Sequence, residues 1–258
     1  MNKFSARILS AFLLLPVFAM AATITFNGPT LPNGTPCTPG NPADCIIGNP
    51  LAFDIFSASL TQPTTAGGKW HLEIQTNYGT TLPGNSIAVP TYSYEGKQFG
   101  MADFMIQSGS DFYAVVISAH DGYAAGSLYK ASGFQTSQQV MGPQGILSIP
   151  RPTLPALLNA GGSLQGAGTI TASQNPNTTG VTSALYKISV DFAAPVSFLS
   201  SGTFTVFAAS YVCDNGFLTG TGSFPPGGSV PEPATWTLAL PMAAWLAMRQ
   251  FGKKHKSF

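Results

Sequence analysis

The sequence predicts an all-β central region, residues 22–223, folded as an antiparallel β-sandwich of the jelly-roll type. Three observations carry this prediction. Apolar side chains recur at every second position in several short runs, which is the period of a strand with one buried face. Turn-forming residues separate these runs. Only 8% of the 258 residues are charged, and no long run has the helical period.

Three strands are expected near the N-terminus. Thr23 to Phe26 opens the sandwich. Leu51 to Leu60 is an apolar and aromatic run, with Leu51, Phe53 and Ile55 on one face. Lys69 to Tyr78 alternates most clearly. Its apolar face holds Trp70, Leu72 and Ile74, and its polar face holds His71, Glu73 and Gln75.

Four further strands are expected in the rest of the region. Ala102 to Gln107 and Phe112 to Ala119 form a hairpin around the turn Ser108-Gly109-Ser110-Asp111. Ala184 to Phe192 and Thr203 to Val212 alternate again, with apolar faces made by Tyr186, Ile188, Val190 and Phe192 and by Phe204, Val206 and Ala208. About seven to ten strands of this kind predict two packed sheets.

Three segments are expected to be long loops: Asn27 to Pro50, Pro143 to Asn159 and Phe224 to Pro233. The second contains Pro150, Pro152 and Pro155, which exclude a regular helix. The third is a Pro/Gly linker, residues 224–233, which is expected to be extended and exposed so that a processing enzyme can bind its backbone. Two glycine-rich pieces, Gly161-Gly162-Ser163 and Gly166-Ala167-Gly168, are expected to be turns between strands.

The N-terminus has the features of a signal peptide over residues 1–21. Lys3 and Arg7 precede an apolar run from Ile8 to Ala21. Ala19-Met20-Ala21 is an Ala-x-Ala cleavage site, so the mature chain is expected to begin at Ala22. The signal segment is expected to be helical.

The C-terminus combines three elements. Val230-Pro231-Glu232-Pro233 comes first, and an uncharged apolar segment from Ala234 to Met248 follows. The tail is basic and contains Arg249, Lys253, Lys254 and Lys256. The apolar segment is short against the roughly 20 residues of a membrane-spanning helix. Snorkelling basic side chains and interfacial tryptophans extend its reach, so residues 234–258 predict one transmembrane helix with a cytoplasmic tail.

This C-terminal arrangement closely resembles the PEP-CTERM sorting signal of Gram-negative bacteria, and the resemblance covers roughly the last thirty residues. It implies that an exported protein is held in the inner membrane by the C-terminal helix. It also implies that an exosortase then processes the chain at the Pro-Glu-Pro element. The expected destination is the cell surface or the extracellular matrix, among extracellular polysaccharide.

The charge of the exported region argues against nucleic acid as a partner. Between Ala22 and Val230 the chain has five basic and nine acidic side chains, a formal net charge of −4. A nucleic-acid-binding surface needs clustered lysine and arginine.

The three cysteines suggest a disulfide more readily than a metal site. In an exported protein, Cys37 and Cys45 are expected to close a short disulfide loop. Cys213 is left to pair with either of them, to remain a thiol, or to link two chains. No Cys-x-x-Cys or paired-histidine pattern indicates zinc, and no metal or other cofactor is expected. Calcium is a lesser alternative, with oxygen ligands drawn from Asp103, Asp111, Asp121 and Asp214.

Two histidine positions are candidate sites. His71 and Glu73 share a strand face and are interpreted as an exposed polar pair, with an acid/base pair as the alternative. His120-Asp121-Gly122 is interpreted as a turn that ends a strand. The alternative is a ligand loop made of His120, Asp121, Tyr123 and Tyr129.

Three functions are compatible with these observations. The first is a non-enzymatic surface or matrix protein associated with exopolysaccharide and biofilm. The second is a carbohydrate-binding sandwich whose aromatic residues stack on sugar rings, with candidates Trp70, Tyr92, Tyr94, Tyr113, Tyr123 and Tyr129. The third is a secreted hydrolase, for which no motif selects a carboxylate pair or a serine nucleophile.

Overall fold

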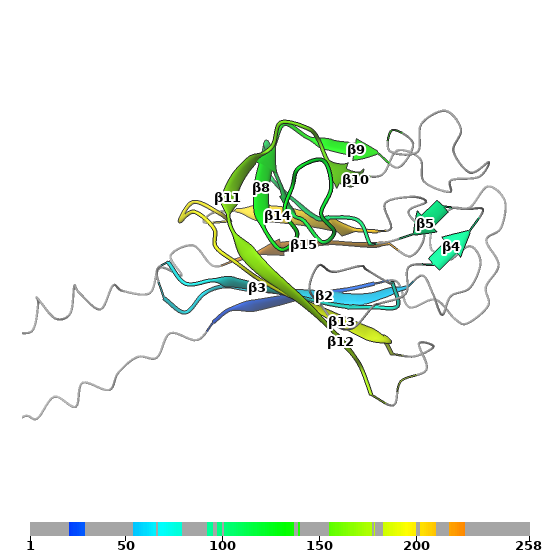
Figure 1. Cartoon of the computed structure of the whole chain (residues 1–258). Helices are drawn as coiled ribbons and strands as arrows, with labels where there is room; N and C mark the ends of the chain where they lie inside the picture. The colour runs from blue at the N-terminus through cyan, green and yellow to red at the C-terminus, as the bar shows by residue number, and fades with distance from the viewer. Residues whose placement is uncertain are drawn as a thin grey trace, which may run out of the picture.

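The computed structural model of the chain describes residues 21–28, 54–65, 67–78, 92–94, 97–99, 101–136, 139, 155–176, 178, 183–199, 202–209 and 217–224. Its fifteen β-strands form two antiparallel sheets packed face to face, with two short ribbons beside them (Figure 1). The all-β prediction is confirmed for the described residues. None of them belongs to a helix long and apolar enough to cross a membrane.

The first large sheet has five strands. Its order is β1 (Thr23–Asn27), β2 (Ile55–Thr61), β3 (Trp70–Thr76), β13 (Tyr186–Phe192) and β12 (Gly168–Gln174). Strands β3 and β13 pair over their full length, from Trp70 opposite Phe192 to Thr76 opposite Tyr186. The expected alternation is confirmed here, since Trp70, Leu72 and Ile74 are buried while the residues between them are half-buried.

The second large sheet has six strands. Its order is β11 (Ser163–Gly166), β8 (Leu128–Ala131), β7 (Asp111–Val115), β6 (Phe104–Ser108), β14 (Thr203–Ala208) and β15 (Leu218–Ser223). The expected hairpin is confirmed: Ser108 pairs with Asp111, and Gly109 takes the left-handed conformation of the turn at a φ of 59°. The two ribbons join β9 (Phe134–Thr136) to β10 (Pro155–Leu158) and β4 (Tyr92–Tyr94) to β5 (Lys97–Phe99).

The main core lies between the two large sheets. Trp70 packs edge-to-face against Phe198 and Phe224, with ring centroids 5.0 Å and 5.3 Å apart. At one edge of the sandwich, Phe26 of β1 packs edge-to-face on Phe204 of β14 and lies over Gly220 of β15. Strands β1 and β15 are therefore neighbours in opposite sheets.

A second, smaller core covers the outer face of the six-stranded sheet. Its buried residues are Met105, Ala114, Val116, Tyr123, Tyr129 and Leu158. The β9–β10 ribbon lies over this face in Figure 1. On β6 the side chains alternate between the two cores, because Phe104 and Ile106 belong to the main core and Met105 to the smaller one.

Two expectations about loops were wrong. The segment Pro143 to Asn159 contains strand β10, with Pro155 at its first position, where a missing N–H is tolerated. Gly166 and Gly168 belong to β11 and β12 and do not form a turn. Any side chain at Gly166 would collide with the Ala193 carbonyl oxygen, and one at Gly168 with that of Gly126. These glycines allow close backbone approach where the chain passes from one sheet to the other.

Strand ends also differ from the expected ones. The second strand begins at Ile55, whereas residues 51–53 lie outside the described residues. Strand β7 ends at Val115, four residues before Ala119, since Val116 bonds to residues of the 124–127 turn region and leaves the ladder. Residues 1–20 of the signal segment, Cys37, Cys45, Cys213, Asp214 and the C-terminal residues 225–258 all lie outside the described residues.

Candidate functional site

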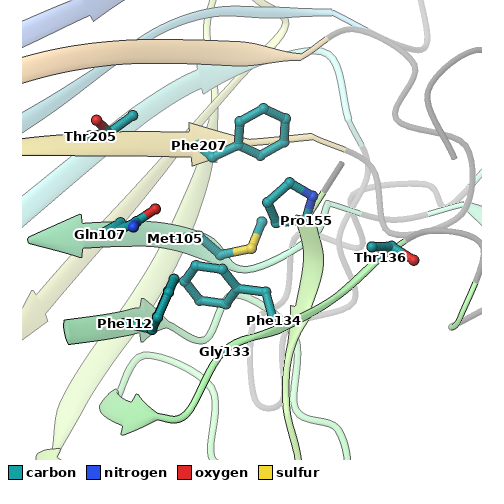
Figure 2. Close-up of a pocket in the computed structure, with 9 residues that line it drawn as sticks. All are labelled: Met105, Gln107, Phe112, Gly133, Phe134, Thr136, Pro155, Thr205 and Phe207. Atoms are coloured by element: carbon teal, nitrogen blue, oxygen red, sulfur yellow. The ribbon is translucent and has the colours of Figure 1, made fainter. Parts of the chain in front are cut away.

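An open groove lies on the outer face of the six-stranded sheet, beside the β9–β10 ribbon (Figure 2). Its volume is about 420 Å³. Side chains from five strands line it, together with Gly133: Met105, Gln107, Phe112, Phe134, Thr136, Pro155, Thr205 and Phe207. Surface that a sandwich normally leaves polar is apolar here, and exposed apolar grooves mark binding sites.

The strand order explains the shape of the groove. Strand β6 runs between β7 and β14, so Met105 forms the floor and is 1% exposed. One wall is Phe207 of β14, which stacks on Phe217 with ring centroids 6.0 Å apart. The other wall is an edge-to-face pair of Phe112 and Phe134, with centroids 5.4 Å apart. All three wall phenylalanines are half-buried and keep part of their rings accessible.

One end of the groove is polar. Gln107 and Thr205 are register partners on β6 and β14, so the amide and the hydroxyl lie side by side. The amide of Gln107 donates to the Gly109 carbonyl oxygen at 3.4 Å, a long hydrogen bond. None of the nine lining residues is charged. The groove therefore offers aromatic surface and neutral hydrogen-bonding groups.

The predicted ligand loop around His120 lies on the same outer face and is connected to the ribbon. His120 Nε2 is 3.0 Å from Asp103 Oδ2, and His120 Nδ1 is 3.2 Å from Asp121 Oδ2. The same Oδ2 of Asp103 accepts a hydrogen bond from the Leu158 amide at 2.9 Å. Asp103 therefore fastens β10, and with it the Pro155 end of the groove, to the large sheet.

Burial and charge act in opposite directions on His120. Partial burial lowers its pKa, but hydrogen bonds and Coulomb attraction from Asp103 and Asp121 outweigh this effect and raise the pKa above its usual value. The Asp103 side chain is only 1% exposed, and its Oδ1 has no hydrogen-bond partner. Asp103 and Asp121 together thus favour the protonated, charged form of His120 in the folded chain.

The two tyrosines of the predicted loop are structural. Tyr123 and Tyr129 are 7% and 8% exposed, and their ring centroids are 4.7 Å apart. The Tyr123 hydroxyl donates to the Asn159 carbonyl oxygen at 2.6 Å and accepts from the Gly162 amide at 2.7 Å. The Tyr129 hydroxyl accepts from the Ala124 amide at 3.0 Å. The structure brings the four loop residues together, but the tyrosine rings present little surface to a ligand.

Other aromatic candidates for sugar stacking are also buried. Trp70 and Tyr113 are 6% and 5% exposed and belong to the main core. Nothing is described of the side chains of Tyr92 and Tyr94. The accessible aromatic surface of the groove instead belongs to phenylalanines that were not among the sequence candidates. Phe207 lies between the inward-facing Val206 and Ala208, so it is an apolar residue on the outward face of its strand. This break in the alternation was the sequence signal that could have indicated an apolar outer face.

The remaining charged candidates form ion pairs. His71 Nδ1 is 2.7 Å from Asp191 Oδ1, and Glu73 is 3.5 Å from the Lys187 ammonium, so both pair with β13 and not with each other. Asp111 pairs with Lys130 at 2.7 Å. Within the part of the chain that the structure describes, no three His, Cys, Asp or Glu side chains are grouped to hold a metal ion.

Comparison with protein-family models, with curated proteins and with solved structures finds no match for this chain.

Proposed function

We propose that this chain is a non-enzymatic protein that is exported and retained at the cell surface or in the extracellular matrix through exopolysaccharide. The proposed localisation rests on two features of the sequence, a signal peptide ending at Ala21 and a C-terminal segment that resembles a PEP-CTERM signal. In this proposal the helix from Ala234 to Met248 holds the precursor in the inner membrane, and an exosortase acts at Pro231-Glu232-Pro233. The β-sandwich, with jelly-roll-like connections, is the exported part.

The observation that carries polysaccharide binding is the aromatic groove on the outer sheet face. Aromatic rings offer flat faces to the C–H groups of sugars, and hydroxyl and amide groups at the groove's end can bond to sugar hydroxyls. A carbohydrate-binding module is therefore the molecular form of retention that the geometry favours. The proposal therefore combines two of the three functions considered above: a surface protein that is retained because it binds carbohydrate.

The chemistry of the groove does not favour hydrolysis at that site. Glycoside hydrolysis generally uses two carboxyl groups on either side of the scissile bond. The groove lining contains no titratable side chain. Among the described carboxyl groups, Glu73, Asp103, Asp111, Asp121 and Asp191 each contact a basic side chain elsewhere. Asp54 has no such contact within the described part of the chain, but it does not line the groove.

A cosedimentation experiment tests this proposal. The protein is purified from its host and mixed with the host's own insoluble polysaccharide, and the bound fraction and the released reducing sugar are both measured. We expect saturable binding without sugar release. Protein that stays in the supernatant at every polysaccharide concentration contradicts retention, and a steady release of reducing sugar contradicts the non-enzymatic proposal.

A further inference from the structure

We propose that the groove between Phe207 and the Phe112–Phe134 pair is the subsite for one neutral, gluco-configured pyranose of a β-linked glycan. This inference rests on the proposed function, because it names the class of sugar that the same site takes. It excludes acidic sugars, such as uronates, from the groove. The argument uses the charge, the width and the polar end of the groove in turn.

The charge of the groove selects a neutral sugar. None of the nine lining residues carries a charge. The ammonium of Lys130, on β8 next to β7, is already paired with Asp111 at 2.7 Å. A uronate or sulfate group placed against the phenylalanines would lose water without gaining a cation, and burying an unpaired charge is strongly unfavourable. A neutral ring loses much less hydration.

The spacing of the strands that carry the two apolar walls leaves room for a single ring between them. Strands β7 and β14 flank β6. Their backbones are thus two strand spacings apart, roughly 10 Å. In Figure 2, Phe207 lies on one side of Met105, and Phe112 and Phe134 lie on the other. A ligand that contacts both walls must present C–H groups on both of its faces.

This two-sided contact selects the configuration of the sugar. In a β-gluco pyranose every ring hydroxyl is equatorial, so both faces consist of axial C–H bonds, which the negative faces of aromatic rings attract. An axial hydroxyl, as in a manno or galacto ring, would place a polar group against one phenylalanine wall without a partner. The equatorial hydroxyls of a gluco ring instead point outward from its rim.

The polar end of the groove can receive those hydroxyls. Gln107 and Thr205 lie opposite each other in register and so provide an amide and a hydroxyl at one point of the rim. An amide offers both donors and an acceptor, and a hydroxyl offers both as well, which matches a sugar hydroxyl. The long 3.4 Å bond from Gln107 to Gly109 is weak enough to be exchanged for a ligand bond.

Calorimetric titration of the full chain, purified from its host, tests the inference with three soluble probes. These are cellohexaose, which is neutral and gluco-configured, mannohexaose, which has axial hydroxyls, and a hexamer of galacturonate, which is acidic. The variants are Phe134→Leu and Phe207→Leu, which keep apolar volume but remove a ring. Val196→Ala and Leu164→Ala are matched controls, because these side chains are exposed apolar residues outside the groove lining, 90% and 56% exposed.

We expect cellohexaose to bind the wild-type chain, and each phenylalanine variant to bind it roughly tenfold more weakly. The two controls should bind like the wild type, mannohexaose should bind more weakly, and the galacturonate hexamer should not bind. Absence of cellohexaose binding overturns the inference, as does equal binding in the phenylalanine variants or tighter binding of the acidic probe. If the host polysaccharide still retains the protein in those cases, the proposed function stands; loss of that retention in the wild type overturns both.

Discussion

Replacing Asp103 by Asn should destabilise the fold and loosen the β10 strand. Oδ2 of Asp103 accepts two hydrogen bonds, from His120 at 3.0 Å and from the Leu158 amide at 2.9 Å. The amide oxygen of Asn can replace a carboxylate oxygen, but charge-assisted bonds of about 1.5–3 kcal/mol become neutral bonds of about 1 kcal/mol. The new NH₂ group would replace Oδ1, which is already buried without a partner in the wild type, so this exchange leaves the number of unpaired buried groups unchanged. We expect a loss of about 1–4 kcal/mol in the free energy of unfolding, because each of the two bonds weakens by roughly 0.5–2 kcal/mol.

The loss should depend on pH because the pKa of His120 is raised in the folded chain. A raised pKa of a histidine stabilises the fold fully below the unfolded value of about 6.5, and the stabilisation is lost as pH rises through the higher folded value. The difference between wild type and Asp103→Asn should therefore be larger at pH 5.5 than at pH 9. Asp121, which also contacts His120 and contributes to its raised pKa, remains present in both proteins.

Urea denaturation at both pH values measures the free energy of unfolding, and hydrogen exchange of the Leu158 amide measures the anchoring of β10. Asp121→Asn is the matched control, because the same histidine is the partner but the Asp121 side chain is 58% exposed. Asn also tolerates the left-handed conformation of this position, a φ of 45°. We expect this control to lose less than about 1 kcal/mol. If the two variants lose the same stability, or if Leu158 exchanges at the wild-type rate in Asp103→Asn, Asp103 is not the anchor of β10.

Three further predictions concern other parts of the chain. Burial raises the pKa of Asp54 to about 6. The folded chain therefore favours the protonated carboxyl, and this stabilisation is complete below the unfolded pKa of Asp54 and is lost as pH rises through about 6. Asp54→Asn should therefore raise the free energy of unfolding at pH 8 by about 1–2 kcal/mol, allowing for partial exposure, and change it little at pH 4; an equal effect at both pH values in urea titrations would contradict the assignment. Gly166→Ala should lower the melting temperature by several degrees, since the new Cβ collides with the Ala193 carbonyl oxygen, whereas a wild-type melting curve would mean that the backbone relaxes freely. Mass spectrometry of the protein from its host should show loss of residues 1–21 and a mature C-terminus near Pro231–Pro233, and a surface form that retains Lys253 to Lys256 would refute the processing scheme.

The strands that alternate apolar and polar residues were predictable, and the glycine-rich strand β15 was not. In β3, β13 and β14 most inward positions hold large apolar side chains, so the period of two is visible in the sequence. In β15 two inward positions are Gly220 and Gly222. Rings of Phe26 and Phe204 occupy the space that side chains there would fill, with Phe204 Cζ 2.9 Å from the position of a Cβ on Gly222. The apolar atoms belong to other strands, which a reading of β15 alone could not detect.

The candidate site was predictable only where its residues are close in sequence. His120, Asp121, Tyr123 and Tyr129 lie within ten residues, and the structure places them together. Asp103, just before β6, joins them only because β10 lies over the outer face of the sheet next to β6, and the Leu158 amide comes from a segment expected to be a loop. The groove phenylalanines come from β7, β9 and β14, far apart in the chain. Their proximity follows from strand order, which local patterns do not encode.

The position of β15 at the sheet edge has a mechanical consequence for a tethered chain. Its last residue, Ser223, pairs with Thr203, and its first, Leu218, pairs with Ala208, so the chain leaves β15 at the end farther from Phe207. Tension applied through the C-terminal end would act along the strand and load the β14–β15 hydrogen bonds together, in shear, so they could not open one at a time. The same pull would turn the apolar end of the groove away from the attachment point.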